Sequence, residues 1–397
     1  MTTLAEARRL QPRDAQELAR ALRDADEAGL AVVPVGAGTK QYLGNPPSRT
    51  DVLLDTRALA GVKEHTPADL TITVRAGTPL AEVQRRLGET GQWLPLDPPH
   101  ADGATVGGVI ATNASGPRRA RYGTLRDLVI GTRVALVDGT IARSGGKVVK
   151  NVAGYDLNKL YIGSLGTLGV VVEVTLKVLP VPARQGAIVA MFPSLRVAID
   201  AAVAIAHTPL RPAALEAHDL EGEPRLLVVA DGQADALERV LTDASRIASE
   251  HGARQVEPAG DAEAALRVSR AIVEADDGLV LHVSLPLAAQ SPFVDELRRI
   301  AAHRGARSGI AVHAGNGIVR ARLSGDPDAV RSATLESVAL AKTLEGDAWI
   351  ERVADDLRAA IDDVWFGEPP GFFLMRRIKE QFDPRGTLNP GRFVGGL

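Results

Sequence analysis

The sequence predicts an α+β fold in more than one domain, and three observations support that prediction. The chain has 397 residues, and at about 150 residues per domain this length suits two or three domains. Hydrophobic residues make up 45% of the chain, which is enough to fill cores without disulfides or structural metals. Glycine-rich turns, short strands and a few helices are mixed over residues 34–170, without the strict βαβαβ order of a Rossmann domain.

Composition and charge exclude several classes of function. The chain has no cysteine, so it cannot hold a disulfide, a thiolate zinc site, an iron–sulfur cluster or a cysteine nucleophile. Its 46 basic and 49 acidic residues leave a net charge of −3, and aromatic residues are only 4% of the chain. A surface that binds nucleic acid is therefore not expected. The sequence has neither a signal peptide nor an apolar run of about 18 residues, which predicts a cytoplasmic protein without a transmembrane segment.

The first part of the chain, up to about residue 182, is expected to hold two helices among short strands. Asp14 is suited to cap a helix that runs to Gly29, with apolar residues at helical spacing. A second helix starts at Leu80 and ends at the glycines of 88–91. The pair Asp138-Gly139 predicts a type I′ hairpin turn. The expected strands, chosen for their β-branched or alternating apolar residues, are 30–35, 52–54, 70–74, 128–137, 140–143 and 169–179.

The second part of the chain alternates strands with long helices. Two βαβ-like units with antiparallel additions predict a ferredoxin-like sheet, and a duplication of that sheet is one form it could take. A last helix is expected at 372–382, before a terminal segment that contains glycine and proline. The other expected elements are helices at 195–207, 233–251, 290–304 and 326–344, and strands at 187–192, 226–230, 279–285, 310–313, 318–323 and 347–350.

Four segments rich in glycine or other small residues carry the functional information. The first, 34–40, follows a buried strand, and its glycines expose successive N–H groups that suit a pyrophosphate, although a structural turn fits them equally well. It matches neither the dinucleotide GxGxxG motif nor a Walker loop. The second, 104–116, has almost no residue larger than valine or isoleucine, as close packing against a flat ligand or a helix requires. The third, 163–170, has glycines at intervals of three, and the fourth is 389–392.

Taken together and in this order, the four segments resemble the flavoproteins of the vanillyl-alcohol oxidase type. The resemblance runs from about residue 10 to 182 and includes the terminal segment 383–392. It implies FAD as the cofactor and a PCMH-type FAD-binding domain of two α+β lobes. The implied domains are a FAD-binding domain (1–182), a ferredoxin-like cap domain on the substrate side (183–370) and a C-terminal segment that returns to the FAD-binding domain (371–397).

Within this family, residues 97–100, 114–119 and 150–157 are most similar to the smaller FAD-binding subunit, the E-type subunit, of bacterial glycolate oxidase. That resemblance implies a FAD-binding subunit of a glycolate oxidase (glycolate dehydrogenase) complex, which supports the oxidation of glycolate to glyoxylate. The implied partners are a catalytic flavin subunit and an iron–sulfur subunit, and any association with a membrane would come through that complex. The absence of cysteine agrees, because electrons that leave the flavin would need an iron–sulfur relay in another chain.

Two other functions stay open on the sequence alone. The chain could be a stand-alone FAD-dependent dehydrogenase of another 2-hydroxy acid, such as D-lactate. It could also be a non-catalytic scaffold that keeps the fold and stabilises its partner subunits. Turnover of the isolated chain with a dye acceptor would indicate the dehydrogenase, and a complex that tolerates bulky residues in the glycine segments would indicate the scaffold.

The resemblance implies that the glycine segments and their neighbours hold FAD. The first loop has no histidine and the chain has no cysteine, so the family's covalent flavin links are missing and a dissociable FAD is expected. The expected cofactor-binding residues are Pro34, Val35, Gly36, Ala37, Gly38, Thr39, Lys40, Pro99, His100, Thr105, Val106, Gly107, Gly108, Asn113, Ser115, Gly116, Tyr122, Gly123, Gly163, Gly166, Thr167, Gly169, Val170, Asn389 and Arg392.

The sequence defines the catalytic residues less well. Larger relatives carry a His-x-Gly-Asp-Gly-Asn-x-His turn that supplies metal or substrate contacts, but residues 313–320 lack its aspartate and its second histidine. A single histidine at a strand end is usually a structural residue, so no metal site is expected. A hydroxy-acid oxidase needs a cation for the substrate carboxylate, and the candidates are His313, Arg320 and Arg392.

Overall fold

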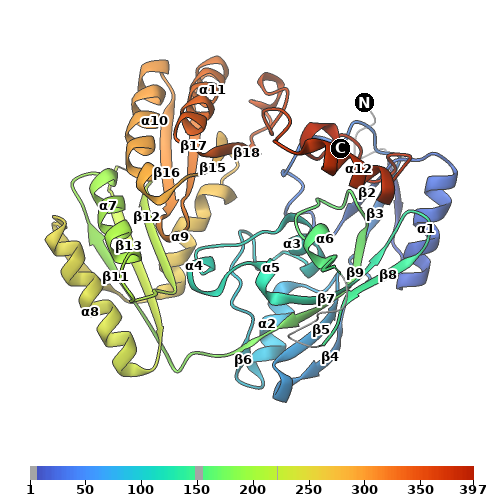
Figure 1. Ribbon diagram of the computed structural model, residues 1–397, viewed down its shortest axis with the longest axis horizontal. Coiled ribbons are helices and arrows are strands. Elements are labelled where there is room, and N and C mark those ends of the chain that lie inside the picture. Colours follow the sequence, from blue (N-terminus) through green and yellow to red (C-terminus); the bar gives the residue numbers. More distant parts are fainter. Residues whose placement is uncertain (1–6, 148–154, 221) are drawn as a thin grey trace. The chain divides into compact units, whose positions relative to one another are not determined.

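The computed structural model describes residues 7–147, 155–220 and 222–397. The chain forms two compact units (Figure 1). Unit 1 comprises Met1–Ser115, Gly123–Val181 and Gly367–Leu397, and unit 2 comprises Gly116–Tyr122 and Pro182–Phe366. The chain therefore leaves unit 1 twice and returns to it at its C-terminal end. Residues 150–154 of the motif at 150–157 lie outside the described residues.

The first lobe of unit 1 is a three-stranded parallel sheet covered by one helix. Its strands, in sheet order, are β1 (Arg8–Leu10), β3 (Val52–Asp55) and β2 (Val32–Val35). Asp14 caps α1 (Ala15–Glu27) as predicted, and its carboxylate accepts the Glu17 N–H at 2.8 Å. The apolar side of α1 packs into the same buried cluster as Leu388, which also bridges to Val32 in parallel. The C-terminal segment thus contributes to the core of this lobe.

The second lobe of unit 1 is a five-stranded antiparallel sheet. Its strands, in sheet order, are β4 (Val62–Thr66), β5 (Thr71–Arg75), β9 (Val170–Lys177), β7 (Val129–Ala135) and β8 (Ile141–Gly145). One face packs on α2 (Leu80–Gly88) and α3 (Val106–Thr112) through buried aliphatic side chains. The predicted valine-rich strand and the predicted second helix are confirmed.

The turn between β7 and β8 is not the predicted type I′ turn. Gly139 has a φ of +84°, but Asp138 does not enter the left-handed region that such a turn requires at both central residues. Instead, the Gly139 N–H donates to the Leu136 carbonyl at 3.1 Å, and the Leu136 N–H donates to the Thr140 carbonyl at 2.9 Å. The connection is a three-residue loop in which only the glycine is left-handed.

Short elements complete unit 1. The helix expected at 372–382 is present as α12, and it precedes the terminal segment that joins the first lobe. The remaining elements of unit 1 are β6 (Gln92–Trp93), α5 (Leu125–Leu128), α6 (Asn158–Tyr161), β10 (Leu179–Pro180) and α12 (Phe372–Phe382), with 3₁₀ turns at Pro67–Asp69 and Val394–Gly396.

Unit 2 is built on one eight-stranded antiparallel sheet that consists of two similar halves. In sheet order the strands are β14 (Gln255–Ala259), β11 (Arg184–Met191), β13 (Arg225–Gly232), β12 (Ala214–Asp219), β16 (Arg307–His313), β17 (Ile318–Ser324), β15 (Leu279–Ser284) and β18 (Asp347–Val353). Each half follows the order β-α-β-β-α-β, with its first strand between its third and fourth, which is the ferredoxin-like arrangement. The halves meet where β12 pairs with β16, the second strand of each. The predicted ferredoxin-like sheet is confirmed, in duplicated form.

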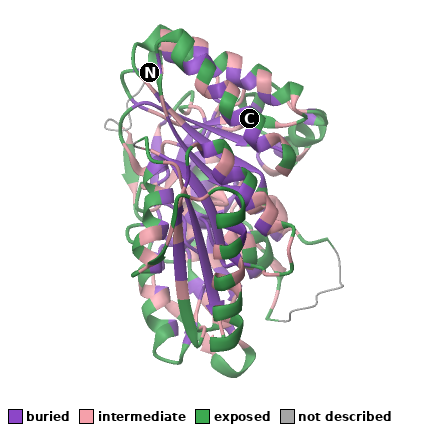
Figure 2. Cartoon of the chain, turned by 90° about the vertical axis from the view of Figure 1, so that its left-hand side faces the viewer, coloured by how far each residue is buried: buried purple, intermediate pink, exposed green. Residues whose placement is uncertain are grey.

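Helices cover the sheet of unit 2 unequally. Alternate strand residues form a large apolar cluster with the four long helices of the two repeats, α7 (Leu195–Ala206), α8 (Ala234–Glu250), α10 (Gln290–Arg304) and α11 (Pro327–Thr343). Figure 2 shows the strands buried and the outer sides of the helices exposed. The opposite face carries a smaller apolar cluster that includes Tyr122 of α4 (Arg119–Tyr122) and three residues of α9 (Ala262–Glu274).

The sequence analysis missed β12, β14 and α9. β12 alternates small apolar residues with Glu216 and His218, and both of these polar residues are buried. Because β12 buries its polar as well as its apolar residues, a search for alternation between buried apolar and exposed polar residues does not detect this strand. β14 contains Pro258 and pairs with β11 alone, which is typical of an edge strand.

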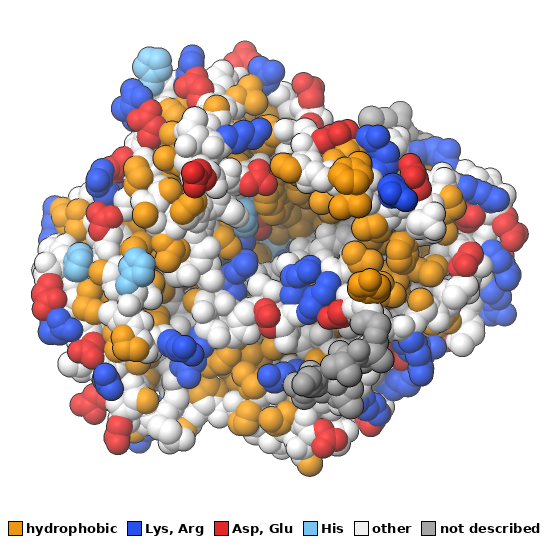
Figure 3. Space-filling view, in the orientation of Figure 1, with side chains coloured by type: hydrophobic (Ala, Val, Ile, Leu, Met, Phe, Trp, Pro, Cys, Tyr) orange, Lys and Arg blue, Asp and Glu red, His pale blue; other side chains and the backbone are white. Residues whose placement is uncertain are grey.

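Two surface properties follow from the described residues. None of the helices described has the length and apolar character needed to cross a membrane. On the face shown in Figure 3, Lys and Arg side chains alternate with Asp and Glu, without a large patch of one sign. That distribution agrees with a net charge of only −3.

Candidate functional site

A groove in unit 1 brings together three of the four segments that the sequence singled out. It has ≈ 470 Å³ of empty space, part of which is open to solvent. Most of the residues around it are small or aliphatic, so main-chain atoms form much of its wall. The lining residues are Pro34, Val35, Gly36, Thr56, Ala76, Gly107, Gly108, Ala111, Tyr161, Ser164, Leu165, Gly166, Gly169, Val170 and Val171.

The first two segments are packed against each other at Gly36. This residue follows β2, and a Cβ atom placed on it would lie 2.1 Å from Thr105 Oγ1. The same hydroxyl caps α3 by accepting the Gly108 N–H at 3.4 Å. Any side chain at position 36 would therefore displace the cap of the helix that carries the second segment.

The turn after Gly36 is joined to the segment that contains Pro99 and His100. Lys40 is buried, and its ammonium group donates to the Pro99 carbonyl. The Tyr42 and His100 rings meet edge to face, with their centroids 6.0 Å apart. The structure thus places Lys40 beside Pro99 and Tyr42 beside His100, although none of these residues lines the groove itself.

The third segment forms a tightly wound loop along the groove. Gly163 and Gly166 have φ values of +83° and +71°, which residues other than glycine rarely adopt. The Ser164 hydroxyl donates to the Tyr161 carbonyl at 2.9 Å, and the Thr167 hydroxyl donates to the Ser164 carbonyl at 2.8 Å. These bonds hold the backbone of the loop in one conformation.

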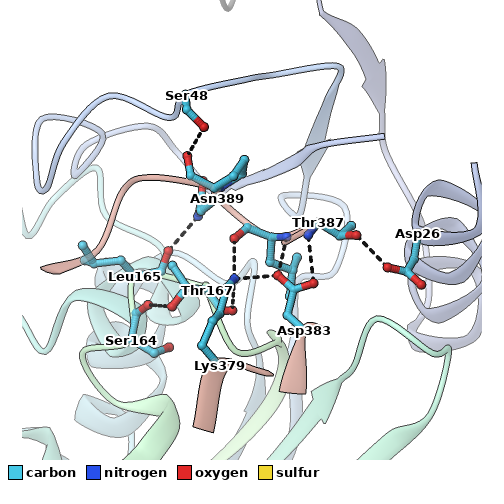
Figure 4. A network of polar contacts seen from close by, with 11 residues as sticks. Asp26, Ser48, Ser164, Leu165, Thr167, Lys379, Asp383, Thr387 and Asn389 are labelled. Atoms are coloured by element: carbon cyan, nitrogen blue, oxygen red, sulfur yellow. Dashed lines mark hydrogen bonds and ion pairs between the residues drawn. The ribbon is translucent and has the colours of Figure 1, made fainter. Parts of the chain in front are cut away.

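The C-terminal segment ties this loop to the first lobe through a buried ion pair (Figure 4). Lys379 Nζ lies 2.5 Å from Asp383 Oδ2, 2.9 Å from the Thr167 carbonyl oxygen and 3.0 Å from that of Leu388. The Asp383 carboxylate accepts the N–H groups of Thr387 and Leu388, both at 2.8 Å. Burial lowers the pKa of Lys379, against the opposing effect of Asp383. Every hydrogen atom of the ammonium group has an acceptor, so the buried pair is fully bonded.

Asn389 and Arg392 extend the same connection. Asn389 Nδ2 donates to the Leu165 carbonyl at 2.7 Å, and its side chain lies 3.4 Å from the position of a Cβ on Gly166. Arg392 donates to the carbonyls of Leu43 and Gln41, each at 3.0 Å. Burial lowers the pKa of Arg392 to about 10. The fourth segment therefore contacts both the first loop and the third segment.

The residues of this groove fit a FAD molecule. Tyr161 lines the groove, and its buried hydroxyl has no hydrogen-bond partner among the described residues. The same holds for Oδ1 of Asn389, whose side chain lies beside Gly166 of the groove, and for Oδ1 of Asn113, whose side chain lies beside Gly163. Native proteins leave few buried polar groups unbonded, so such atoms mark places where the polar groups of a ligand can bind. A wall of backbone and small side chains with a few fixed polar groups is typical of nucleotide cofactor sites.

Gly116 and Tyr122 were also expected to bind the cofactor, and this expectation stays a prediction. Both belong to unit 2, where the Tyr122 hydroxyl donates to Asp231 Oδ2 at 2.8 Å and Arg121 pairs with the same carboxylate at 2.7 Å. Gly123 lies in unit 1, where it packs against Asp127 rather than against the groove. Ser115 is buried, and Val106 belongs to the core cluster of the second lobe.

The other expected site residues, His313 and Arg320, belong to a buried polar row in unit 2. The row crosses the sheet on the face opposite the four long helices and consists of Glu216, His313, Arg320, Glu351 and His282. His313 Nδ1 lies 2.6 Å and 2.7 Å from the two Glu216 oxygens, and Arg320 donates to His313 Nε2. Arg320 Nε donates to Glu351 Oε2 at 2.6 Å, and His282 Nδ1 lies 3.3 Å from the same oxygen.

The protonation states of this row follow from burial and from Arg320. Burial raises the pKa of Glu216 well above its ordinary value. Burial, followed by the charge of Arg320, lowers the pKa of His313 well below its ordinary value. Burial alone would raise the pKa of Glu351, but Arg320 and His282 outweigh it and hold that pKa below its ordinary value. A guanidinium group can only donate hydrogen bonds, so Nε2 of His313 is the acceptor and Nδ1 carries the proton.

Sequence reasoning missed several of these residues. Glu216 and Glu351 occupy strand positions with no motif around them, and His282 was not among the expected site residues. Tyr161 and Lys379 follow helical patterns that are equally typical of core and surface residues. One signal was available for Lys379, because Asp383 lies four residues further along at the end of a predicted helix.

Two family models match the chain. A model of the FAD binding domain matches residues 7–145, and a model of the C-terminal domain of FAD linked oxidases matches residues 365–393. The first match contains the segments at 34–40 and 104–116. The second contains α12 and the terminal segment with Asn389 and Arg392.

Curated relatives include two proteins named as glycolate oxidase subunits, from different bacteria, and a dehydrogenase. The chain is 29% identical over 414 residues to glycolate oxidase subunit GlcD of Bacillus subtilis, with 96% of this chain and 87% of that relative covered. It is 47% identical over 148 residues to glycolate oxidase subunit GlcE of Escherichia coli, which covers 37% of this chain and 42% of that relative. It is 30% identical over 418 residues to the D-lactate dehydrogenase of Archaeoglobus fulgidus, with 98% of this chain and 91% of that relative covered.

A solved structure shares the fold. An alkyldihydroxyacetonephosphate synthase superposes with a TM-score of 0.74 at 18% sequence identity, covering 97% of this chain and 77% of that chain. At this level of identity the likeness concerns the fold alone. Together with the FAD binding domain model it confirms the predicted fold class.

Proposed function

The chain belongs to the family of FAD-linked oxidases, and from this premise we propose that it is the E-type, FAD-binding subunit of a glycolate oxidase complex. It is a FAD-dependent oxidoreductase of the group that acts on 2-hydroxy acids. Beyond this shared activity, we propose three further properties: the E-type subunit identity, glycolate as the substrate of the complex, and an iron–sulfur partner.

The groove of unit 1 is the observation that carries this proposal. Residues as far apart in the chain as Pro34 and Val171, which are 137 positions apart, line one cavity, and most of the lining residues are small or aliphatic. In this groove, FAD would be held by the residues at 34–36, 107–108 and 164–170. Asn389 and Arg392 would hold these loops in place through their bonds to the Leu165 and Leu43 carbonyls. The loop after β2 has no histidine and the chain has no cysteine, so we propose that the cofactor is held without a covalent bond.

Oxidation of glycolate to glyoxylate removes two electrons and two protons from the substrate, and FAD when bound supplies the two-electron acceptor. The residues of this chain would bind and orient that acceptor and exclude water from it. Without cysteine the chain has no iron–sulfur relay of its own. We therefore assign the onward transfer of electrons to an iron–sulfur subunit of the complex.

The polar row of unit 2 favours a supporting subunit over a complete active site. A general base needs a nitrogen free to accept a proton from substrate, but His313 has Glu216 at one ring nitrogen and Arg320 at the other. Its lowered pKa also makes it a weak base. Arg320 is paired with Glu351. Arg392, the third nominated cation, binds the turn at 41–43, so we propose that it orients the first loop of the groove.

Similarity to a known E-type subunit supports the same assignment. Identity to the GlcE relative reaches 47% over 148 residues, although the match covers only 42% of that relative. Identity to the GlcD relative is 29% over a much longer stretch. Both relatives are subunits of a glycolate oxidase by name.

Co-purification with the products of neighbouring genes tests the proposal. The complex is expected to carry flavin in this chain, to contain iron in another chain, and to reduce a dye with glycolate. Removal of this chain from the co-expression should abolish that activity. A chain that contains no flavin, either alone or with its partners, contradicts the proposal.

A second candidate is a stand-alone dehydrogenase for D-lactate or a similar 2-hydroxy acid. It is favoured by the 30% identity to a D-lactate dehydrogenase over 98% of this chain. In that case Arg320 would hold the substrate carboxylate. The isolated, flavin-loaded chain would then reduce a dye with one member of a panel of 2-hydroxy acids, and a lack of turnover across the panel would eliminate this candidate.

A further inference from the structure

Tyr161 is a fixed aromatic residue in the wall of the groove. It is the last residue of α6, its side chain is only 2% exposed, and it lines the groove of unit 1. Its ring meets that of Phe382 edge to face, with the centroids 6.0 Å apart and an interplanar angle of 84°. Phe382 ends α12, so the C-terminal segment that holds the third loop also fixes this ring.

The hydroxyl of Tyr161 has no partner among the described residues, although it is buried. A buried hydroxyl without a hydrogen-bond partner destabilises the folded protein, so a ligand atom that bonds to the Tyr161 hydroxyl explains why this hydroxyl is present. Burial raises the pKa of this hydroxyl. It therefore keeps its proton at neutral pH and can donate a hydrogen bond.

A second unbonded polar atom lies at the same groove. Asn389 is 1% exposed, and its Nδ2 is bound to the Leu165 carbonyl at 2.7 Å, while its Oδ1 has no partner among the described residues. Its side chain lies next to Gly166, which lines the groove. The groove therefore offers one fixed donor and one fixed acceptor, which suits a ligand that has both oxygen atoms and N–H or O–H groups.

We infer that the Tyr161 hydroxyl donates a hydrogen bond to an oxygen atom on the ADP half of FAD. A phenol donor needs an oxygen or nitrogen acceptor, and the ribose and pyrophosphate are the parts of FAD richest in oxygen. The small residues around Tyr161, among them Gly107, Gly108 and Gly166, allow that polar chain to approach the backbone. This inference rests on the proposed function only in taking FAD as the ligand.

The variant Tyr161→Phe removes the oxygen atom and leaves the ring on Phe382. It is expected to weaken FAD binding about ten-fold and to leave the apo-protein at least as stable as the wild type, because an unbonded buried group is lost. FAD affinity is measured by quenching of flavin fluorescence, and apo-protein stability by urea denaturation of the full chain. If Tyr161 had only a structural role, the variant would not lose FAD affinity while the apo-protein kept its stability.

Thr334→Val is the matched control. The Thr334 hydroxyl is buried in α11 of unit 2 and donates to the Val330 carbonyl at 2.8 Å, so its loss is expected to lower stability and to leave FAD affinity unchanged. Competition with ADP then locates the contact, since Tyr161→Phe should weaken ADP and FAD by the same factor.

Three outcomes would overturn the inference. The first is a Tyr161→Phe variant with wild-type FAD affinity, the second is one with a destabilised apo-protein, and the third is one that loses affinity for FAD but not for ADP. A wild-type chain that binds no FAD would instead contradict the proposed function itself.

Discussion

Lys379 donates a hydrogen bond to the main-chain carbonyl of Thr167, 212 residues earlier in the chain, over 2.9 Å. Thr167 belongs to the loop whose residues at 164–166 line the groove. Lys379 and Asp383 are buried together, and each also bonds to the backbone around Leu388. The pair therefore sets the position of the loop relative to the first lobe.

Lys379→Met is expected to destabilise unit 1 and to weaken FAD binding. The change leaves the Asp383 carboxylate buried without its cation, which costs about 3–5 kcal/mol, and it releases the Thr167 carbonyl. Urea denaturation measures the first effect and flavin fluorescence the second. The double variant Lys379→Met with Asp383→Leu should lose less stability than Lys379→Met alone, because no buried charge is left unpaired.

Lys342→Met serves as the control for the loss of a lysine, because Lys342 is exposed on α11 of unit 2. Little change is expected in either measurement. Equal stabilities and equal FAD affinities for Lys379→Met and the wild type would show that the ion pair does not position the loop.

Gly36→Ala should disturb the contact between the first two segments. The new methyl group would lie 2.1 Å from Thr105 Oγ1, so either the turn or the cap of α3 must move. We expect weaker FAD binding and a loss of stability of about 1–3 kcal/mol, the range for overpacking. Thr105→Ala in the same chain removes the clashing oxygen and should restore part of the affinity.

Gly88→Ala is the matched control for that substitution. Gly88 ends α2, its added Cβ would meet no atom within 4 Å, and the α-helical position favours alanine over glycine. This variant should bind FAD normally and be as stable as the wild type or slightly more stable. If Gly36→Ala behaves like Gly88→Ala, position 36 does not need glycine.

Arg320→Met separates the two candidate functions. Glu351 loses its buried cation, so unit 2 should be destabilised by about 3–5 kcal/mol. For the E-type subunit, the assembled complex is expected to keep its KM for glycolate at temperatures where the variant is folded. For a stand-alone dehydrogenase, KM would rise strongly because the carboxylate of the substrate loses its cation. Steady-state kinetics of the assembled complex and of the isolated chain therefore distinguish the two candidate functions.

His218 makes the stability of unit 2 depend on pH. It is 7% exposed, and burial, with a smaller contribution from Arg225, lowers its pKa to about 4. In the unfolded chain His218 binds a proton below about pH 6.5. In the folded chain it binds that proton only below about pH 4. Stability is therefore fully present above about pH 6.5 and is lost as the pH falls, by up to about 3 kcal/mol for this residue.

Urea denaturation at pH 7 and at pH 4.5 measures this loss. His218→Gln should reduce the difference between the two pH values, and other groups with shifted pKa values, among them His282 and His313, contribute to the part that remains. A His218→Gln variant with the same pH dependence as the wild type would contradict the prediction.

Local patterns in the sequence were enough to predict most of the fold. Helical spacing and an N-cap predicted α1, and the valine-rich run predicted β9, because both elements bury one face against a nearby partner. The ferredoxin-like halves of unit 2 followed from the order of strands and helices. The pairing of β12 with β16, which joins the halves into one sheet, depends on contacts between distant strands and left no local pattern.

The site was predicted in part for a similar reason. Glycines such as Gly36 and Gly166 are needed for local geometry, so their spacing in the sequence reveals them. The polar row around Arg320 could not be found in this way, because each of its members lies on a different strand and only the folded sheet aligns them. Gly116 and Tyr122 were expected at the cofactor site, which stays a prediction, and within unit 2 the Tyr122 hydroxyl donates to Asp231.

The place of Leu388 in the first lobe sets an order of events during protein synthesis. A ribosome makes α1 and the strands of this lobe first, and it makes the residue that completes their apolar cluster only near the end of the chain. All of unit 2 is translated in between. Nascent chains that stop before residue 388 should therefore carry no flavin, and the cofactor should be acquired after translation has passed this residue.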